Sequence, residues 1–277
     1  MIAPSSASGG LTGITAMQNT VPAGGIAATR STPRTRSADR GSMPRVGTLY
    51  LIRHGQASYG QADYDRLSPR GIEQALAVGR WAASARLDAL YAGPLRRQQQ
   101  TAESANQGAG GGLPPPHTLA ELAEYPAYEM LQHLVPRLIE EDARFAELTS
   151  APTPRLLDQA FHTILTRWSR NEWTVDGVER VEAFVDRIRT GLDRVLRASG
   201  SGARLACITS AGPIGVAVGL VFGIPAERMV RTSIVIRNAS ITELRFRSQG
   251  FDWQPDQLSL VTFNVTAHLP DELHTER

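Results

Sequence analysis

An arginine and a histidine follow the first apolar run of the chain. Residues 49–52, Leu-Tyr-Leu-Ile, are typical of a short buried strand, and Arg53, His54 and Gly55 come directly after it. Charged side chains at the end of a buried strand are solvated, ion-paired or bound to a ligand, and an isolated pair is most often solvated. The other polar residues of the chain decide between these three interpretations.

Three further segments place polar side chains where an apolar run ends or a helix is about to begin. In an open α/β sheet, ligands bind outside the carboxyl ends of the strands, so we expect these residues and His54 to meet at one edge. They are Arg96 and Arg97 after the second apolar run, Glu121 and Glu124 in an extended piece before Pro126, and Thr209 and Ser210, followed by Ala211 and Gly212, after the third run.

Two arginines, one histidine and one carboxylate at a common edge suit the binding of a phosphoryl group. Guanidinium groups bind phosphoryl oxygens through paired hydrogen bonds. A neutral imidazole can attack phosphorus, and nearby arginines favour the unprotonated form of His54. The backbone N–H of Gly55 is expected to donate to the anion. A carboxylic acid could protonate the departing oxygen.

Strands alternate with helices along the ordered part of the chain, which begins near Val46. The helix at 67–83 has Ser68 as N-cap and Pro69 at its first position. We expect its buried face to carry Ile72, Ala75, Leu76, Gly79 and Ala83. The other predicted helices are 95–106, 178–196 and 213–223, and the predicted strands are 49–52, 86–94 and 204–210, with two β-rich pieces at 233–246 and 258–265.

This alternation predicts an α/β fold, a three-layer sandwich in which helices flank a mostly parallel sheet. Residues 127–175 look purely helical and are expected to form an inserted cap. Residues 1–43 are rich in Ser, Thr, Gly, Ala and Pro and are expected to be disordered, because they contain too little apolar surface to bury. The α/β domain is therefore expected to span 44–277.

Composition excludes several classes of function. All 29 basic residues are arginine, which removes Schiff-base chemistry and the P-loop lysine. The formal net charge of +2 gives no reason to expect a nucleic-acid partner. The longest apolar stretch, 215–224, is too short to cross a bilayer, so no membrane partner is expected. With Cys207 as the single cysteine, no internal disulfide is possible, and we expect a cytoplasmic protein. No metal site or other cofactor is expected.

Four segments in this order resemble the histidine phosphatase superfamily, which includes phosphoglycerate mutase. Residues 49–58, "LYLIRHGQAS", resemble its first strand and RHG motif, and 67–75, "LSPRGIEQA", its L-[ST]-x-x-G-x-x-Q-A helix start. Residues 92–102, "AGPLRRQQQTA", resemble its S-x-L-x-R-A-x-Q-T segment. Residues 208–214, "ITSAGPI", resemble the segment that usually supplies a second histidine.

The resemblance implies that His54 becomes phosphohistidine and that Arg53 and Arg97 bind the phosphoryl oxygens. Gly55, Ser210 and Ala211 would also line the substrate site. Glu124 would be the general acid, and Glu121 is an open alternative because the pattern L-x-E fits both. The neighbouring Arg96 is expected to form a surface salt bridge.

One residue departs from the family pattern. Ser210 stands where most members have the second histidine, which suggests a branch of the family with serine at this place and lower activity, because serine brings no positive charge. His268 could take over that role, although packing is the commoner use of a lone histidine.

The expected function is therefore a phosphomonoesterase, a hydrolase that acts through phosphohistidine on His54. Two alternatives stay open: a phosphoglycerate mutase-type phosphoryl transferase, and a catalytically weak regulatory protein that binds a phosphorylated ligand. The expected partner is a small phosphorylated substrate or inorganic phosphate. A homodimer is left open.

Overall fold

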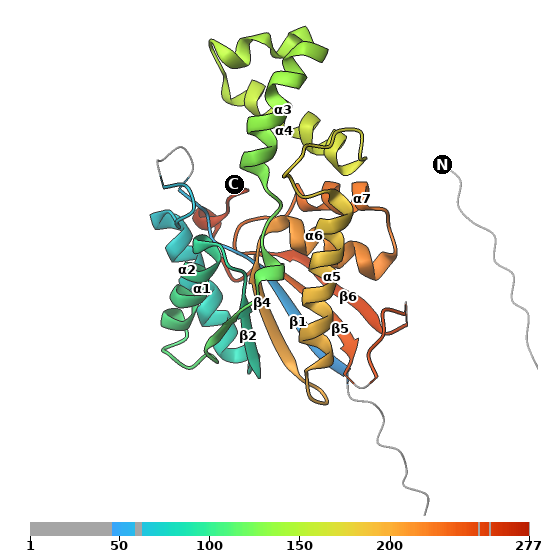
Figure 1. The fold of residues 1–277 in the computed structure, drawn as a ribbon. Coiled ribbons are helices and arrows are strands. Elements are labelled where there is room, and N and C mark those ends of the chain that lie inside the picture. Colours follow the sequence, from blue (N-terminus) through green and yellow to red (C-terminus); the bar gives the residue numbers. More distant parts are fainter. Residues whose placement is uncertain (1–45, 59–62, 249, 255, 277) are drawn as a thin grey trace, which may run out of the picture. The chain divides into compact units, whose positions relative to one another are not determined.

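The structure is a computed structural model, and it describes residues 46–58, 63–248, 250–254 and 256–276. The predicted disordered segment, 1–43, lies outside these residues. The described part forms the predicted α/β sandwich, in which a six-stranded sheet is covered by helices on both faces (Figure 1). Among the described residues, no helix is both long and apolar enough to span a membrane.

The strands are arranged in the order β3-β2-β4-β1-β5-β6. Strand β1 pairs in parallel with β4, and β2 pairs in parallel with β4 and β3, whereas β5 runs antiparallel to both of its neighbours. The central pair β1 and β4 is buried on both faces, as continuous apolar runs predict. The strands are β1 Val46–Arg53, β2 Ala89–Ala92, β3 Pro116–Thr118, β4 Arg204–Thr209, β5 Ile241–Arg247 and β6 Leu258–Val265.

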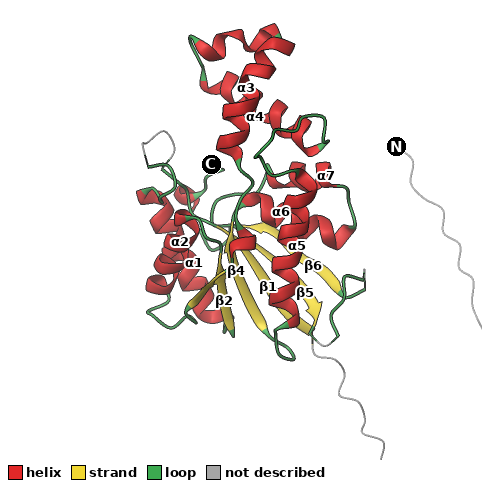
Figure 2. Cartoon of the chain, viewed as in Figure 1, coloured by secondary structure: helices red, strands yellow, loops and turns green. Residues whose placement is uncertain are grey.

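Helices of different composition cover the two faces of the sheet (Figure 2). Helices α1 (Pro69–Ala85) and α2 (Arg96–Gly108) pack on one face through alanines and glycines. Helices α5 (Val181–Arg197) and α6 (Ala211–Phe222) pack on the other face through larger apolar side chains, and α7 (Ala226–Ser233) packs on α6.

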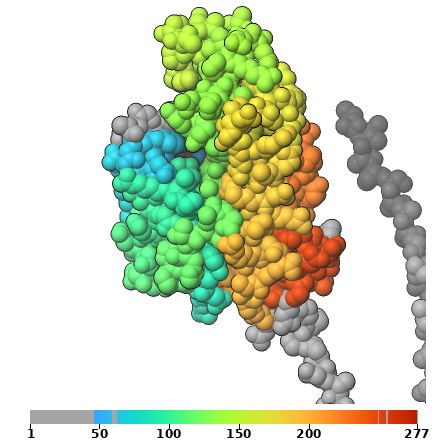
Figure 3. Space-filling model, viewed as in Figure 1, coloured from blue at the N-terminus to red at the C-terminus, as the bar shows by residue number. Residues whose placement is uncertain are grey.

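The expected cap consists of α3 (Ala127–Glu141), the 3-10 helix η2 (Ala143–Thr149) and α4 (Pro154–Ser169). Figure 3 shows the segment around α3 projecting beyond the body of the sheet and its helices. Met130, Leu134 and Leu138 are the buried residues of α3, and they recur at helical spacing.

Helix α1 begins as predicted, because the Ser68 side chain accepts a hydrogen bond from the Gly71 N–H and Pro69 is the first helical residue. The predicted face is partly wrong: Ile72 and Ala83 are exposed, and Gln74 is buried. Gln74 is buried because its side chain binds the Gln56 N–H, the Leu273 carbonyl and Thr275 Oγ1. Elsewhere on α1, small residues allow the close approach of α2. A Cβ atom on Gly79 would overlap the backbone carbonyl oxygen of Ala105.

The C-terminal third differs from the prediction between Ala226 and Ile241, where helix α7 was not expected. Residues 233–246 were expected to be β-rich, but β5 begins only at Ile241 and Ser233 ends α7. The intervening turn carries Ala239 in the left-handed region, with φ of 55°. Its backbone N–H donates to the His54 carbonyl oxygen at 3.2 Å, so the turn is packed against the end of β1.

Candidate active site

His54 lies at the carboxyl end of β1, where its N–H donates to the Thr209 carbonyl of β4 at 2.8 Å. Two contacts assign the imidazole tautomer. Nδ1 lies 2.7 Å from the Gly55 carbonyl oxygen, which can only accept, and Nε2 lies 3.1 Å from the donor Nε of Arg97. The proton is therefore on Nδ1, and Nε2 holds its lone pair toward Arg97.

Burial keeps the His54 imidazole neutral. It lowers the pKa of His54 well below 6.5, and the positive charges of Arg97 and Arg53 lower the pKa further. The hydrogen bond to Gly55 opposes this shift but does not outweigh it. The direction agrees with the sequence-based expectation that the arginines favour the unprotonated form.

Arg97 lies in the first turn of α2 and is 9% exposed. Its Nη1 pairs with the Asp65 carboxylate, and its guanidinium lies 5.6 Å from the centroid of the Tyr64 ring. Its neighbour Arg96 forms an exposed ion pair with Asp63, as expected. The role of Asp65 was not predicted, because nothing in the local sequence links it to a residue 32 positions later.

Arg53 also belongs to this group, since it interacts electrostatically with Arg97 and Glu124. Its Nη1 donates to the backbone carbonyls of Ile236 and, at 3.1 Å, Glu276. Its Nε is buried and has no hydrogen-bond partner among the described residues. An unpaired buried donor of this kind calls for an explanation, such as an ion or water bound nearby.

The structure gives the Gly55 amide a different partner from the expected one. This N–H was expected to donate to the anion, but it donates at 3.1 Å to Oγ1 of Thr101. The Thr101 hydroxyl in turn donates to the Arg97 carbonyl oxygen at 2.7 Å. The amide is therefore used to join the residue after His54 to helix α2, and Gly55 contributes its carbonyl to the imidazole.

Glu124 follows the 3-10 helix η1 (Ala120–Leu122), and two backbone N–H groups hold its carboxyl group. Oε1 accepts from Tyr125 N and Oε2 from Gly212 N, each at 3.1 Å. The carboxyl group lies so close to α6 that a Cβ atom on Gly212 would overlap Oε1. Burial raises the pKa of Glu124, and these hydrogen bonds together with Arg97 and Arg53 oppose the increase without cancelling it.

Glu121, the alternative acid, points elsewhere. Its Oε1 forms an ion pair with Nη2 of Arg194 on α5 at 2.6 Å. The structure therefore brings Glu124, and not Glu121, together with Arg53 and Arg97.

Ser210 precedes α6 and has no exposed surface. Its Oγ accepts a hydrogen bond of 2.9 Å from Nε2 of Gln98. Ala211 begins α6 and is partly buried against the larger core. The pairing of Ser210 with Gln98 was not predicted, because Gln98 stands among three consecutive glutamines that the sequence does not distinguish.

His268 lies against Trp81 of α1, with ring centroids 6.4 Å apart. Burial lowers its pKa to about 4, and its Nε2 is buried without a hydrogen-bond partner. This packing agrees with the commoner use of a lone histidine and gives no support to His268 as a replacement for the histidine that the family pattern would place at position 210.

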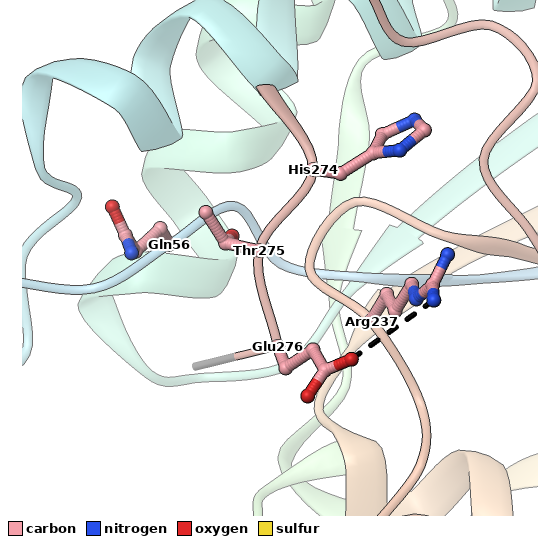
Figure 4. A pocket seen from close by; sticks show the side chains of 5 residues that line it. All are labelled: Gln56, Arg237, His274, Thr275 and Glu276. Atoms are coloured by element: carbon pink, nitrogen blue, oxygen red, sulfur yellow. Dashed lines mark ion pairs between the residues drawn. The ribbon is translucent and has the colours of Figure 1, made fainter. Parts of the chain in front are cut away.

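A cavity of about 540 Å³ lies beside the His54 segment (Figure 4). It is lined by Gln56, by Arg237, and by the C-terminal residues His274, Thr275 and Glu276. The tail is held there by Gln74, whose Nε2 donates to the Leu273 carbonyl and to Thr275 Oγ1 at 2.6 and 2.8 Å. Within the described part of the chain, no cluster of three or more His, Cys, Asp or Glu residues could hold a metal ion.

Three solved structures with this fold are informative. A mycobacterial glucosyl-3-phosphoglycerate phosphatase is 19% identical, with a TM-score of 0.56, over 80% of this chain and 100% of that one. A phosphoglycerate mutase from Bacillus anthracis is 16% identical, with a TM-score of 0.56, over 81% of this chain and 96% of that one. A phosphoserine phosphatase mutant from Entamoeba histolytica, in complex with phosphoserine, is 19% identical, with a TM-score of 0.51, over 81% of this chain and 100% of that one.

Identities this low establish a shared fold. No curated protein matches the chain. The family comparison goes further, because the sequence model of the histidine phosphatase superfamily (branch 1) matches residues 49–155 and 132–255. These matches include the segments around His54, Arg97, Glu124 and Ser210 and extend over most of the chain. The resemblance seen in the sequence is confirmed, and the chain belongs to branch 1 of the histidine phosphatase superfamily.

Proposed function

We propose that the protein is a phosphomonoesterase that hydrolyses a small phosphate ester through a phosphohistidine on His54. The observation that carries the proposal is the imidazole tautomer. Nδ1–H is fixed by the Gly55 carbonyl, so the lone pair is on Nε2, where it accepts a hydrogen bond from Arg97 and lies near the Arg53 guanidinium. A neutral, oriented imidazole next to cations is what attack on a phosphoryl group requires.

In the first step, Nε2 of His54 forms a bond to phosphorus while the bond from phosphorus to the ester oxygen breaks. The phosphoryl oxygens take the place of the imidazole as partners of the Arg97 guanidinium, and the positive charge of Arg53 stabilises them. The leaving oxygen takes the proton of Glu124, whose raised pKa keeps the acid protonated to a higher pH than usual. The Gly55 carbonyl stabilises the positive charge that develops on the ring.

In the second step, water attacks phosphorus, and the bond between Nε2 and phosphorus breaks. The Glu124 carboxylate accepts a proton from this water, which regenerates the acid, and inorganic phosphate is released. Atoms and charge balance without a cofactor. Each residue named acts twice, so loss of one of them should slow both steps.

The test is hydrolysis of an aryl phosphate by the purified protein and by His54→Ala. Turnover that falls by at least ~10³-fold in the variant supports the proposal, because the variant has no nucleophile. His268→Ala is the matched control, since this buried histidine lies against Trp81 and is expected to keep its activity. Equal turnover by the wild type and His54→Ala would overturn the proposal.

A second candidate is a protein that binds a phosphorylated ligand with little turnover. Ser210 favours it, because a buried serine adds no positive charge where a second histidine would stand. Binding of inorganic phosphate that depends on Arg97, without turnover of any phosphate ester offered, would support this candidate. The mutase activity, the homodimer and the cytoplasmic location stay predictions.

A further inference from the structure

Gln98 is a buried amide whose hydrogen-bonding groups are all used. It follows Arg97 in the first turn of α2 and has no exposed surface. Oε1 accepts from Leu95 N at 3.0 Å, and Nε2 donates to the Leu122 carbonyl at 3.1 Å and to Ser210 Oγ at 2.9 Å. Both amide protons are therefore donated to different segments of the chain.

These two segments are the ones that hold Glu124. The Leu122 carbonyl lies two residues before Glu124, and Ser210 lies two residues before Gly212, whose N–H donates to the Glu124 carboxylate. Oγ1 of Thr209 also donates to the Leu122 carbonyl, at 2.7 Å, which joins the same two segments a second time. The Gln98 amide therefore bridges both sides of the acid.

The same turn of α2 holds the nucleophile. Arg97 donates from Nε to Nε2 of His54, so consecutive residues of one helix contact the imidazole and the support of the acid. A catalytic acid and a nucleophile act together only when their separation is held, and a misplacement of about 1 Å costs about 10²-fold in rate. Helix α2 is a rigid element suited to this task.

We propose that Gln98 is a positioning residue that sets the Glu124 carboxyl group relative to His54. The inference rests on the proposed function, in which Glu124 protonates the leaving oxygen. Gln98 itself touches no substrate. It acts through the Leu122 carbonyl and through Ser210, which is buried and paired with Gln98.

Leaving-group dependence tests this role. An aryl phosphate releases a stable phenolate that needs little protonation, whereas an alkyl phosphate releases an alkoxide that needs an acid. Glu124→Gln should therefore lower kcat/KM about 10²-fold more for the alkyl substrate than for the aryl substrate, because kcat/KM excludes the second step that both substrates share. Gln98→Met keeps the length of the side chain and removes its hydrogen bonds. It should show the same selective loss in kcat/KM at about tenfold.

Gln99→Met is the matched control. Gln99 lies next in the chain, and its Nε2 donates to the Gly93 carbonyl at 2.6 Å and to Thr118 Oγ1 at 3.3 Å, neither of which contacts Glu124. It should change both substrates equally or not at all. Ser210→Ala removes one of the contacts of Gln98 and should show a smaller selective loss, so it carries the test if Gln98→Met fails to fold.

The outcomes distinguish the claim that Glu124 is the acid from the claim that Gln98 positions it. If Glu124→Gln lowers kcat/KM equally for both substrates, Glu124 does not protonate the leaving oxygen, and the proposed function is at fault. If Glu124→Gln is selective while a folded Gln98→Met is unchanged, or slows both substrates equally, Gln98 does not position the acid. Selective loss in both variants, with none in Gln99→Met, supports the inference.

Discussion

The two faces of the sheet are packed in different ways, and each supplies a different half of the site. On the α1 and α2 face, small residues let backbones touch, as at Gly79 and the Ala105 carbonyl. On the α5 and α6 face, large side chains fill most of the space, including Phe184, Met229 and Trp168, although Gly215 of α6 also lies against the Met229 carbonyl. His54 is held by the first face through Arg97, whereas Glu124 is next to Tyr125, whose ring packs on Phe184 and Trp168.

This difference predicts which regions of the molecule tolerate substitutions that add volume. A contact between two backbones cannot adjust, because neither partner has rotamers to change. A contact between side chains can repack at a lower cost. We therefore expect the half that binds the phosphoryl group to be sensitive to added volume and the half beside the cap to be more tolerant.

The largest effect is expected from Gly79→Ala. The new methyl group would overlap the Ala105 carbonyl and force α1 and α2 apart, which should lower the free energy of unfolding by at least about 3 kcal/mol. Gly219→Ala is the control on the other face, where the methyl group would overlap the Met229 side chain. It should cost about 1 kcal/mol or less, because a methionine can change rotamer. Urea unfolding measures both, and equal losses would contradict the comparison.

Gly212→Ala should disturb the acid while leaving the fold intact. The methyl group would overlap Glu124 Oε1 and displace the carboxyl group from the Gly212 N–H. Hydrolysis of an alkyl phosphate should fall by about 10²-fold, and hydrolysis of an aryl phosphate much less. Steady-state rates on the two substrates measure this effect. Equal rates in wild type and variant would show that Glu124 has no role in leaving-group departure.

The pH dependence of kcat/KM should reflect the two opposite pKa shifts. Activity needs neutral His54, whose pKa is lowered well below 6.5, and protonated Glu124, whose pKa is raised. Activity on an alkyl phosphate should therefore persist into acid and fall, by up to about tenfold per pH unit, as pH rises through the raised pKa of Glu124. Glu124→Gln should lose this alkaline limb on the same substrate, which controls for titration of the substrate itself. An unchanged limb in the variant would assign the titration to another group.

Thr101→Val should have a smaller effect. It leaves the Gly55 N–H without an acceptor, and a buried unpaired donor costs about 1 to 3 kcal/mol of stability. Activity should also fall, because the Gly55 carbonyl orients the His54 ring. Thr166→Val on α4 is the control, since its exposed hydroxyl likewise donates to a carbonyl four residues earlier, that of His162. The midpoint of thermal unfolding and the turnover rate of this control should stay near the wild-type values.

The sequence correctly predicted the features that depend on residues close together in the chain. Continuous apolar runs predicted β1 and β4, and Ser68 and Pro69 predicted the start of α1. The motifs brought Arg53, His54, Arg97 and Glu124 to one edge, and the structure places them together. The short strand β3 and helix α7 were not expected, because three to eight residues carry too little periodicity to be recognised.

Contacts between distant residues could not be predicted. Nothing near Gln74 or Gln98 in the chain shows that one binds the C-terminal tail and the other Ser210. The hydrogen-bond partner of the Gly55 amide could not be predicted either, because it depends on how α2 packs beside β1. In each case a buried polar side chain completes its hydrogen bonds with segments far away in the sequence.

The central claim, that Nε2 of His54 forms a covalent bond to phosphorus, is tested most directly by trapping the intermediate. The protein is mixed with a phosphate ester labelled at phosphorus and quenched in alkali, where phosphohistidine survives. The account predicts label on the peptide that contains His54, and none in His54→Ala. Rapid hydrolysis without label on that peptide, or label on another residue, would contradict it.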